Sequence, residues 1–129
     1  MKLFQEYFRV LSELKPKIFV FENVKGLLSM QGGSLFNQIL ALFESIGYNV
    51  SYKLLNAADY GAPQIRERVI IVGTLGTETF EFPVPTHYNP EEGVQLFNCE
   101  LKPYVTLGEA IGDLGELQNG GSCVNYACS

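Results

Sequence analysis

The sequence is poor in the residues that most often build metal centres and nucleophilic triads. Its 129 residues include one histidine, His87, and three cysteines, Cys99, Cys123 and Cys128. A single histidine leaves little material for a zinc site or a histidine-based triad. An odd number of cysteines without metal-finger spacing indicates reduced thiols with structural or incidental roles, not a disulfide framework. We therefore predict no metal site.

Long apolar runs are also lacking. No stretch approaches the roughly 20 apolar residues of a membrane span. Residues 1–6 turn amphipathic at once and lack the apolar core of a signal peptide. We therefore expect an intracellular, cytoplasmic protein with no membrane partner. The hydrophobic content of 47% indicates a folded chain, and the length allows one domain with a modest core.

Basic residues are scarce in the second part of the chain. Residues 76–129 contain one Lys or Arg and eight Asp or Glu, whereas residues 1–75 contain eight and six. The resulting charges of −7 and +2 give the net charge of −5. An acidic segment repels phosphate, so this chain alone should bind nucleic acid weakly. Any such role must rest on a few placed arginines or on basic parts that lie elsewhere.

Hydrophobic periodicity predicts the regular elements. Two amphipathic helices are expected, one over residues 3–14 that Pro16 stops, and one that begins with Ser34 as its cap and ends at Gly47. A third, short helix is expected over residues 107–114 with a capping box. Strands are expected at 18–22, 50–55 and 69–74, followed by an extended, proline-punctuated segment at 80–85.

The order of these elements predicts an α/β fold. Residues 18–55 form a strand–helix–strand unit whose crossover should be parallel and right-handed. The connection to 69–74 is too irregular for another helical crossover, so that strand should return antiparallel, between the other two. The apolar strand 18–22 should be buried on both faces. It also needs a neighbour on its other side, and this chain has no strand left to supply one.

Polar side chains gather where the first and third strands should meet. Glu22 and Asn23 end the first strand, at the rim where ligands bind in open α/β sheets. Gln64, Arg66 and Arg68 alternate along the approach to the third strand, so they should share a side while the glutamate between the arginines faces away. Such a cluster could grip a planar group that carries donors and acceptors. An ion-pair network that only ties down the loop remains an equal alternative.

These two clusters carry a resemblance to a known family. Glu22-Asn23-Val24 after an apolar strand, followed by Gln64-Ile65-Arg66-Glu67-Arg68 before another strand, resembles the DNA cytosine-5 methyltransferases in motif order, spacing and flanking strands. The resemblance implies a partial doubly wound, Rossmann-like, S-adenosylmethionine-dependent methyltransferase sheet with one antiparallel strand. It also implies that residues 1–76 are the second half of a catalytic domain and that 77–129 lead toward a target recognition domain.

The resemblance further implies a mechanism. In this family a cytosine is flipped out of double-stranded DNA, a cysteine thiolate attacks C6, and C5 receives a methyl group from S-adenosylmethionine. Glu22 matches the glutamate that holds N3 and the exocyclic amine, and should be partly desolvated so that it can share a proton. Arg68 matches the arginine at O2, and Arg66 its partner, which shapes the pocket. Asn23 and Gln64 would support the surrounding backbone.

Two family motifs are absent from the sequence. There is no glycine-rich Phe-x-Gly-x-Gly loop, and none of the three cysteines follows a proline. We therefore expect a fragment of a restriction-modification type enzyme, nucleoid-associated if bacterial, that is inactive alone and does not bind S-adenosylmethionine. The remainder of the enzyme would be the partner of this fragment. The open edge of strand 18–22 in the fragment should promote self-association. Two alternatives stay open, namely a non-catalytic interaction module and an RNA cytosine-5 methyltransferase.

Overall fold

The computed structural model describes residues 2–92 and 100–114. Its contacts divide the chain into two compact units, which we describe separately. The first unit consists of Met1–Asn56 and Glu67–Val84, and the second of Ala57–Arg66 and Pro85–Ser129. Cys99, Cys123 and Cys128 lie outside the described residues, so the prediction about them is not tested. No helix in the described ranges is long and apolar enough to cross a membrane.

The first unit is built on a three-stranded sheet in the order β1-β3-β2. Strand β3 (Glu67–Leu75) pairs antiparallel with both β1 (Ile18–Val24) and β2 (Tyr48–Asn56), so β1 and β2 run parallel to each other. The predicted strand order and the antiparallel return of β3 are therefore confirmed. The division of the chain at residue 76 remains a prediction.

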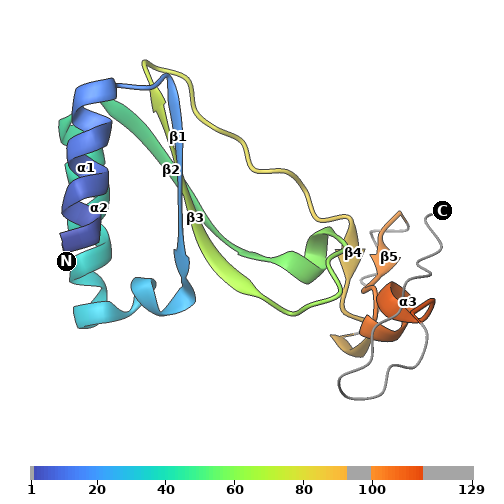
Figure 1. Cartoon of the computed structure of the whole chain (residues 1–129). Coiled ribbons are helices and arrows are strands. Elements are labelled where there is room, and N and C mark those ends of the chain that lie inside the picture. The colour runs from blue at the N-terminus through green and yellow to red at the C-terminus, as the bar shows by residue number, and fades with distance from the viewer. Residues whose placement is uncertain (1, 93–99, 115–129) are drawn as a thin grey trace. The chain divides into compact units, whose positions relative to one another are not determined.

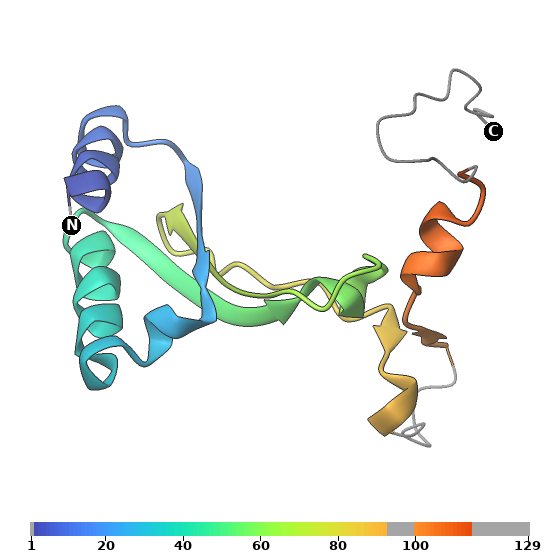
Figure 2. The ribbon, with the colours of Figure 1, turned by 60° about the horizontal axis from the view of Figure 1, so that its bottom comes forward.

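Helices α1 (Lys2–Leu14) and α2 (Ser34–Ser45) lie side by side on the same face of this sheet, as both Figure 1 and Figure 2 show. Their apolar sides and the inward side chains of the strands form the core, with Phe43, Val69 and Ile71 fully buried. The Phe19 ring lies between two other rings, with centroid distances of 4.6 Å to Phe43 and 4.8 Å to Tyr48. Buried aromatic side chains contribute large apolar contact areas to a small core.

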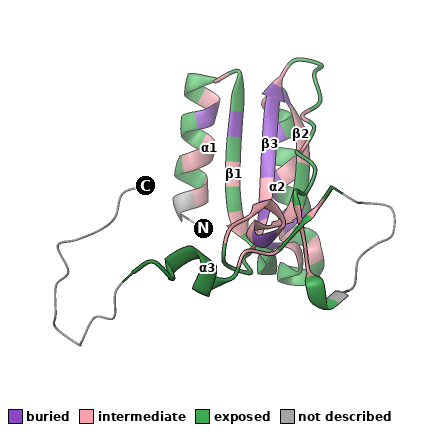
Figure 3. Cartoon of the chain, turned by 90° about the vertical axis from the view of Figure 1, so that its right-hand side faces the viewer, coloured by how far each residue is buried: buried purple, intermediate pink, exposed green. Residues whose placement is uncertain are grey.

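Burial is concentrated in the central strand (Figure 3). β3 is apolar and lies between two strands, whereas β1 alternates between buried and exposed positions. The prediction that β1 is buried on both faces is therefore wrong for this chain, because Ile18 and Val20 are 57% and 59% exposed. The helices cover only the face that carries Phe19 and Phe21.

The outer edge of β1 is open in the described part of the chain. The Leu75 N–H donates to the Lys17 carbonyl at 2.9 Å. In an antiparallel pair every second residue of a strand is hydrogen-bonded to its partner, so Phe19, Phe21 and Asn23 face β3 in the same way. The backbone groups of Ile18, Val20 and Glu22 consequently point away from β3. The Tyr7 hydroxyl donates to the Val20 carbonyl at 3.1 Å. Strand β1 is thus an edge strand, as its need for a further neighbour predicted.

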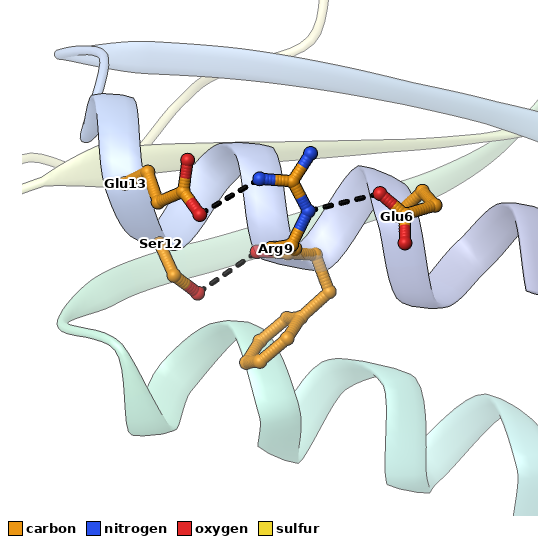
Figure 4. Close-up of polar contacts among 5 residues, drawn as sticks. Glu6, Arg9, Ser12 and Glu13 are labelled. Atoms are coloured by element: carbon orange, nitrogen blue, oxygen red, sulfur yellow. Dashed lines mark hydrogen bonds and ion pairs between the residues drawn. The ribbon is translucent and has the colours of Figure 1, made fainter.

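The ends of α2 follow the sequence only in part. Gly47 adopts a left-handed φ of 96° just after α2, as predicted. The predicted cap of α2 is wrong, because Gly33 precedes the helix without a side-chain cap and the Ser34 hydroxyl instead donates backwards to the Gln31 carbonyl at 2.9 Å. On the exposed side of α1, Arg9 donates to both Glu6 and Glu13 (Figure 4).

The second unit contains short elements: η3 (Ala57–Tyr60), β4 (His87–Tyr88), η4 (Pro90–Glu92), β5 (Lys102–Pro103) and α3 (Leu107–Ile111). Strands β4 and β5 pair in parallel. The predicted capping box is present, because the Thr106 hydroxyl accepts from the Glu109 N–H while the Glu109 carboxylate accepts from the Thr106 N–H. The helix itself is shorter than predicted and ends at Ile111.

Candidate functional site

Glu22 and Arg68 form an ion pair across the β1–β3 ladder. The Arg68 Nε donates to Glu22 Oε1 at 2.8 Å. The two residues are diagonal neighbours, because Glu22 lies opposite Ile70 and Arg68 lies opposite Val24. In an antiparallel pair such residues share one face of the sheet, here the face opposite the helices. The structure therefore brings together the carboxylate and one of the arginines that the sequence predicted to meet.

A second hydrogen bond fixes the Arg68 guanidinium. Its Nη1 donates to the Glu67 carbonyl at 2.8 Å, and the side chain is 24% exposed. These two bonds use two of the five N–H groups of an arginine. Glu22 is 51% exposed and accepts from Arg68 through one carboxylate oxygen. The pair therefore presents donors and an acceptor side by side, which is the arrangement that recognises a planar polar ring.

The expected partial desolvation of Glu22 concerns a site that holds a base, and it stays a prediction. In this chain about half of the side chain's surface is accessible. The reason is that α1 and α2 cover the other face of the sheet, so solvent reaches the face on which Glu22 lies (Figure 1). Exposed ion pairs of this kind contribute only about 0.2–1 kcal/mol to stability. The pair therefore contributes little to the stability of the sheet, and the choice between a structural and a binding role stays a prediction.

Asn23 supports the backbone at the end of β1. Its side-chain oxygen accepts from the Val24 N–H at 2.9 Å, a group on the open side of the strand. The bond is local to the end of β1, and the supporting role of Asn23 in the site stays a prediction. Glu67 faces away from Arg68, as predicted, and its carboxylate instead contacts the Lys25 Nζ.

Gln64 and Arg66 lie in the loop Ala57–Arg66 of the second unit. The Ala57 N–H donates to the Arg66 carbonyl at 3.0 Å and so closes the loop at its base. Both predicted side chains are exposed. Because these residues and Glu22 belong to different units, their predicted convergence on Glu22 stays a prediction.

Three contacts within the second unit fasten this loop. The Thr86 N–H donates to the Asp59 carbonyl at 2.8 Å, and the Tyr104 hydroxyl donates to the Asp59 carboxylate. The His87 ring packs against Gly61, where a Cβ would lie 2.7 Å from the ring. Sequence reasoning missed these partners because no periodic pattern connects residues so far apart. The one signal in the sequence was Gly61, a residue type that marks turns; in the structure it has a φ of 89°.

The described residues offer little for a metal or a cofactor. Residues 2–92 and 100–114 contain no group of three or more His, Cys, Asp or Glu side chains that could hold a metal ion. Gly32 and Gly33, with φ values of 67° and 88°, form a turn before α2, but β1 ends several residues earlier and η1 (Lys25–Leu28) intervenes. The strand–glycine-rich turn–helix cradle for a nucleotide-like cofactor is therefore not present in this part of the chain.

Comparison with known proteins gives one family. The family model described as C-5 cytosine-specific DNA methylase matches residues 1–125. The Type II methyltransferase M.BspRI of Lysinibacillus sphaericus is 54% identical over 114 residues, which cover 87% of this chain and 25% of the relative. The Type II methyltransferase M.BsuRI of Bacillus subtilis is 47% identical, covering 87% of this chain and 24% of the relative.

Two further comparisons extend this result. M.AquIA of a Picosynechococcus strain, also a Type II methyltransferase, is 44% identical, covering 84% of this chain and 48% of the relative. The crystal structure of a prophage-encoded DNA modification methyltransferase (E. coli) superposes with a TM-score of 0.60 at 24% identity, covering 90% of this chain and 30% of the other. This likeness supports the fold. The chain thus spans between about a quarter and a half of the curated relatives named here.

Proposed function

Because the chain belongs to the C-5 cytosine-specific DNA methylase family, we propose that it forms the base-binding part of an enzyme that methylates C5 of cytosine in double-stranded DNA. The observation that carries this proposal is the Glu22–Arg68 pair on the uncovered face of the sheet. The Type II relatives favour an enzyme of a restriction-modification system. The three-stranded sheet would be one side of a larger, doubly wound sheet that continues beyond the open edge of β1.

Glu22 would bind the edge of a flipped-out cytosine. One carboxylate oxygen accepts from Arg68, so the other is available to the exocyclic amine or, when protonated, to N3. Negative charge develops on the ring when a nucleophile adds to C6, and a proton held at N3 stabilises that charge. Glu22 would therefore act most strongly in the transition state, not in ground-state binding of DNA.

Arg68 would complete the recognition of the base. Its guanidinium is already oriented by Glu22 and by the Glu67 carbonyl, so its remaining N–H groups lie beside the carboxylate and can donate to O2. Arg66 is proposed to shape the pocket and its nucleophile loop. Asn23 and Gln64 are proposed to hold the backbone around it. Pre-oriented donors need no reorganisation when charge develops on the base, which favours the transition state.

The methyl group would come from S-adenosylmethionine, as in the family. The described residues offer no cradle for this cofactor, so we propose that other parts of the enzyme bind it. We likewise propose that the nucleophilic cysteine lies elsewhere, because no Pro-Cys dipeptide occurs in the sequence. On this account the chain alone is inactive.

A chimaera tests the proposal. The segment of M.BspRI that matches this chain is replaced by the matching part of this chain, which is 87% of its length and 54% identical to that segment. The purified chimaera should transfer radioactive methyl groups from S-adenosylmethionine to C5 of cytosine in duplex DNA. Glu22→Ala and Arg68→Ala should abolish transfer, whereas Glu6→Gln on the exposed side of α1 should not.

A folded chimaera without activity, alongside active M.BspRI, would refute the proposed function. Methylation of RNA in place of duplex DNA would refute the assigned substrate. Full activity of Glu22→Ala would show that the pair does not bind the base.

A further inference from the structure

A second ion pair crosses β1 and β3 at the same end as the first. The Lys25 Nζ lies 3.0 Å from Glu67 Oε1 and 2.9 Å from Oε2. Lys25 follows directly after β1, and Val24–Arg68 is the last paired position of the ladder, so this contact lies one step beyond it. The strand ends are therefore tied at the point where backbone pairing stops.

The two ion pairs lie on opposite faces of the sheet. Successive side chains of a strand point to opposite faces, so Glu67 faces the helix side while Arg68 faces the other side with Glu22. Glu67 also connects the two ion pairs through hydrogen bonds. Its carboxylate accepts from Lys25, and its backbone carbonyl accepts from Arg68 Nη1 at 2.8 Å. A movement of the Glu67 backbone consequently moves an acceptor of the Arg68 guanidinium.

Stability alone does not explain this second pair. Lys25 and Glu67 side chains are 58% and 41% exposed, so their interaction contributes only about 0.2–1 kcal/mol. What the pair adds is a side-chain contact between the end of β1 and the start of β3, which narrows the range of positions that these two ends can take. Those two backbones carry Glu22 and Arg68, whose relative position decides how well both side chains can bind the edge of one base.

We infer that Lys25 and Glu67 are positioning residues that hold the Glu22–Arg68 pair in its base-binding geometry. This inference rests on the proposed function for its consequence in catalysis. Its structural part stands independently, because it concerns a link between two ion pairs of this chain.

The direct test measures hydrogen exchange at the Arg68 Nε by NMR in the chimaera. Lys25→Met removes the charge but keeps an unbranched side chain, and Lys17→Met at the other end of β1 is the matched control. Lys25→Met should accelerate exchange at Arg68 about two- to fivefold, whereas Lys17→Met should not. Lys25→Arg should retain slow exchange, and the swap Lys25→Glu with Glu67→Lys should restore it.

Kinetics supply the second measurement. Lys25→Met should lower kcat about two- to fivefold with little change in KM for DNA, and the charge swap should recover kcat. If exchange at Arg68 is equal in Lys25→Met and Lys17→Met, the inference is overturned. Should Lys25→Met unfold, Glu67→Ala decides the question, because it removes the acceptor of the same contact at a partly exposed position. An inactive but folded chimaera would refute the proposed function and leave the exchange test intact.

Discussion

Gly73→Ala should destabilise the sheet at the point where β1 and β3 are locked together. Gly73 lies opposite Phe19, and a Cβ at Gly73 would lie 2.1 Å from Phe19 Cε1 and 2.5 Å from Cζ. The Phe19 ring has little room to move, because it is 5% exposed and packs against Phe43 and Tyr48. Overpacking of this kind costs about 1–3 kcal/mol.

Urea denaturation of the chain and its variants at one protein concentration measures this cost. Gly26→Ala is the matched control, since no atom lies within 4 Å of a Cβ at that position. Gly26→Ala should change the free energy of unfolding by less than about 1 kcal/mol. Adding Phe19→Leu to Gly73→Ala should cost less than the sum of the two single changes, because the smaller side chain relieves the clash. Equal stabilities of Gly73→Ala and Gly26→Ala would refute this reasoning.

Three further predictions concern the rest of the chain. The hydrogen bonds that Glu109 accepts from the Thr106 backbone and side chain lower the pKa of its carboxyl group, so the capping box should stabilise α3 above the unfolded pKa and lose this effect as the pH falls through the folded pKa. NMR chemical shifts of α3 during an acid titration, with Glu109→Gln as control, test this, and pH-independent shifts would contradict it. The chain alone should not bind S-adenosylmethionine, and a stoichiometric, micromolar site in calorimetry would disprove that claim. The chain should self-associate through the open edge of β1, with its exposed Ile18 and Val20. The apolar face of α1, which the sequence offered as a second route, packs in the core and is not available. Light scattering over a wide dilution range measures this, and a stable monomer at micromolar concentration would contradict it.

The sheet order was predictable because two simple signals agree. The apolar run of β3 favours a central position, and the connection before it has no helical pattern, so an antiparallel return between β1 and β2 follows. Burial of β1 was not predictable in the same way. An apolar strand is buried only if something covers both faces, and that depends on elements other than its own sequence.

The candidate site was predictable only in part. Alternation along an extended segment correctly placed Arg68 on one side and Glu67 on the other. The partner of Glu67 depends on the register between β1 and β3, which brings Lys25 opposite it and which periodicity does not reveal. The contact of Asp59 with Tyr104 was not predictable either, because these residues lie 45 positions apart and no hydrophobic pattern relates their segments.

The most direct test of the account is the single-turnover rate of methyl transfer by the chimaera with Glu22→Gln. This change keeps the shape of the side chain but removes its ability to share a proton with the base. If Glu22 stabilises charge on the reacting ring, the rate should fall at least about 100-fold while the Kd for DNA changes only a few-fold. The control Glu6→Gln should retain the full rate. A Glu22→Gln rate within about threefold of the unmodified chimaera would contradict the role of Glu22 and, with it, the proposed base-binding site.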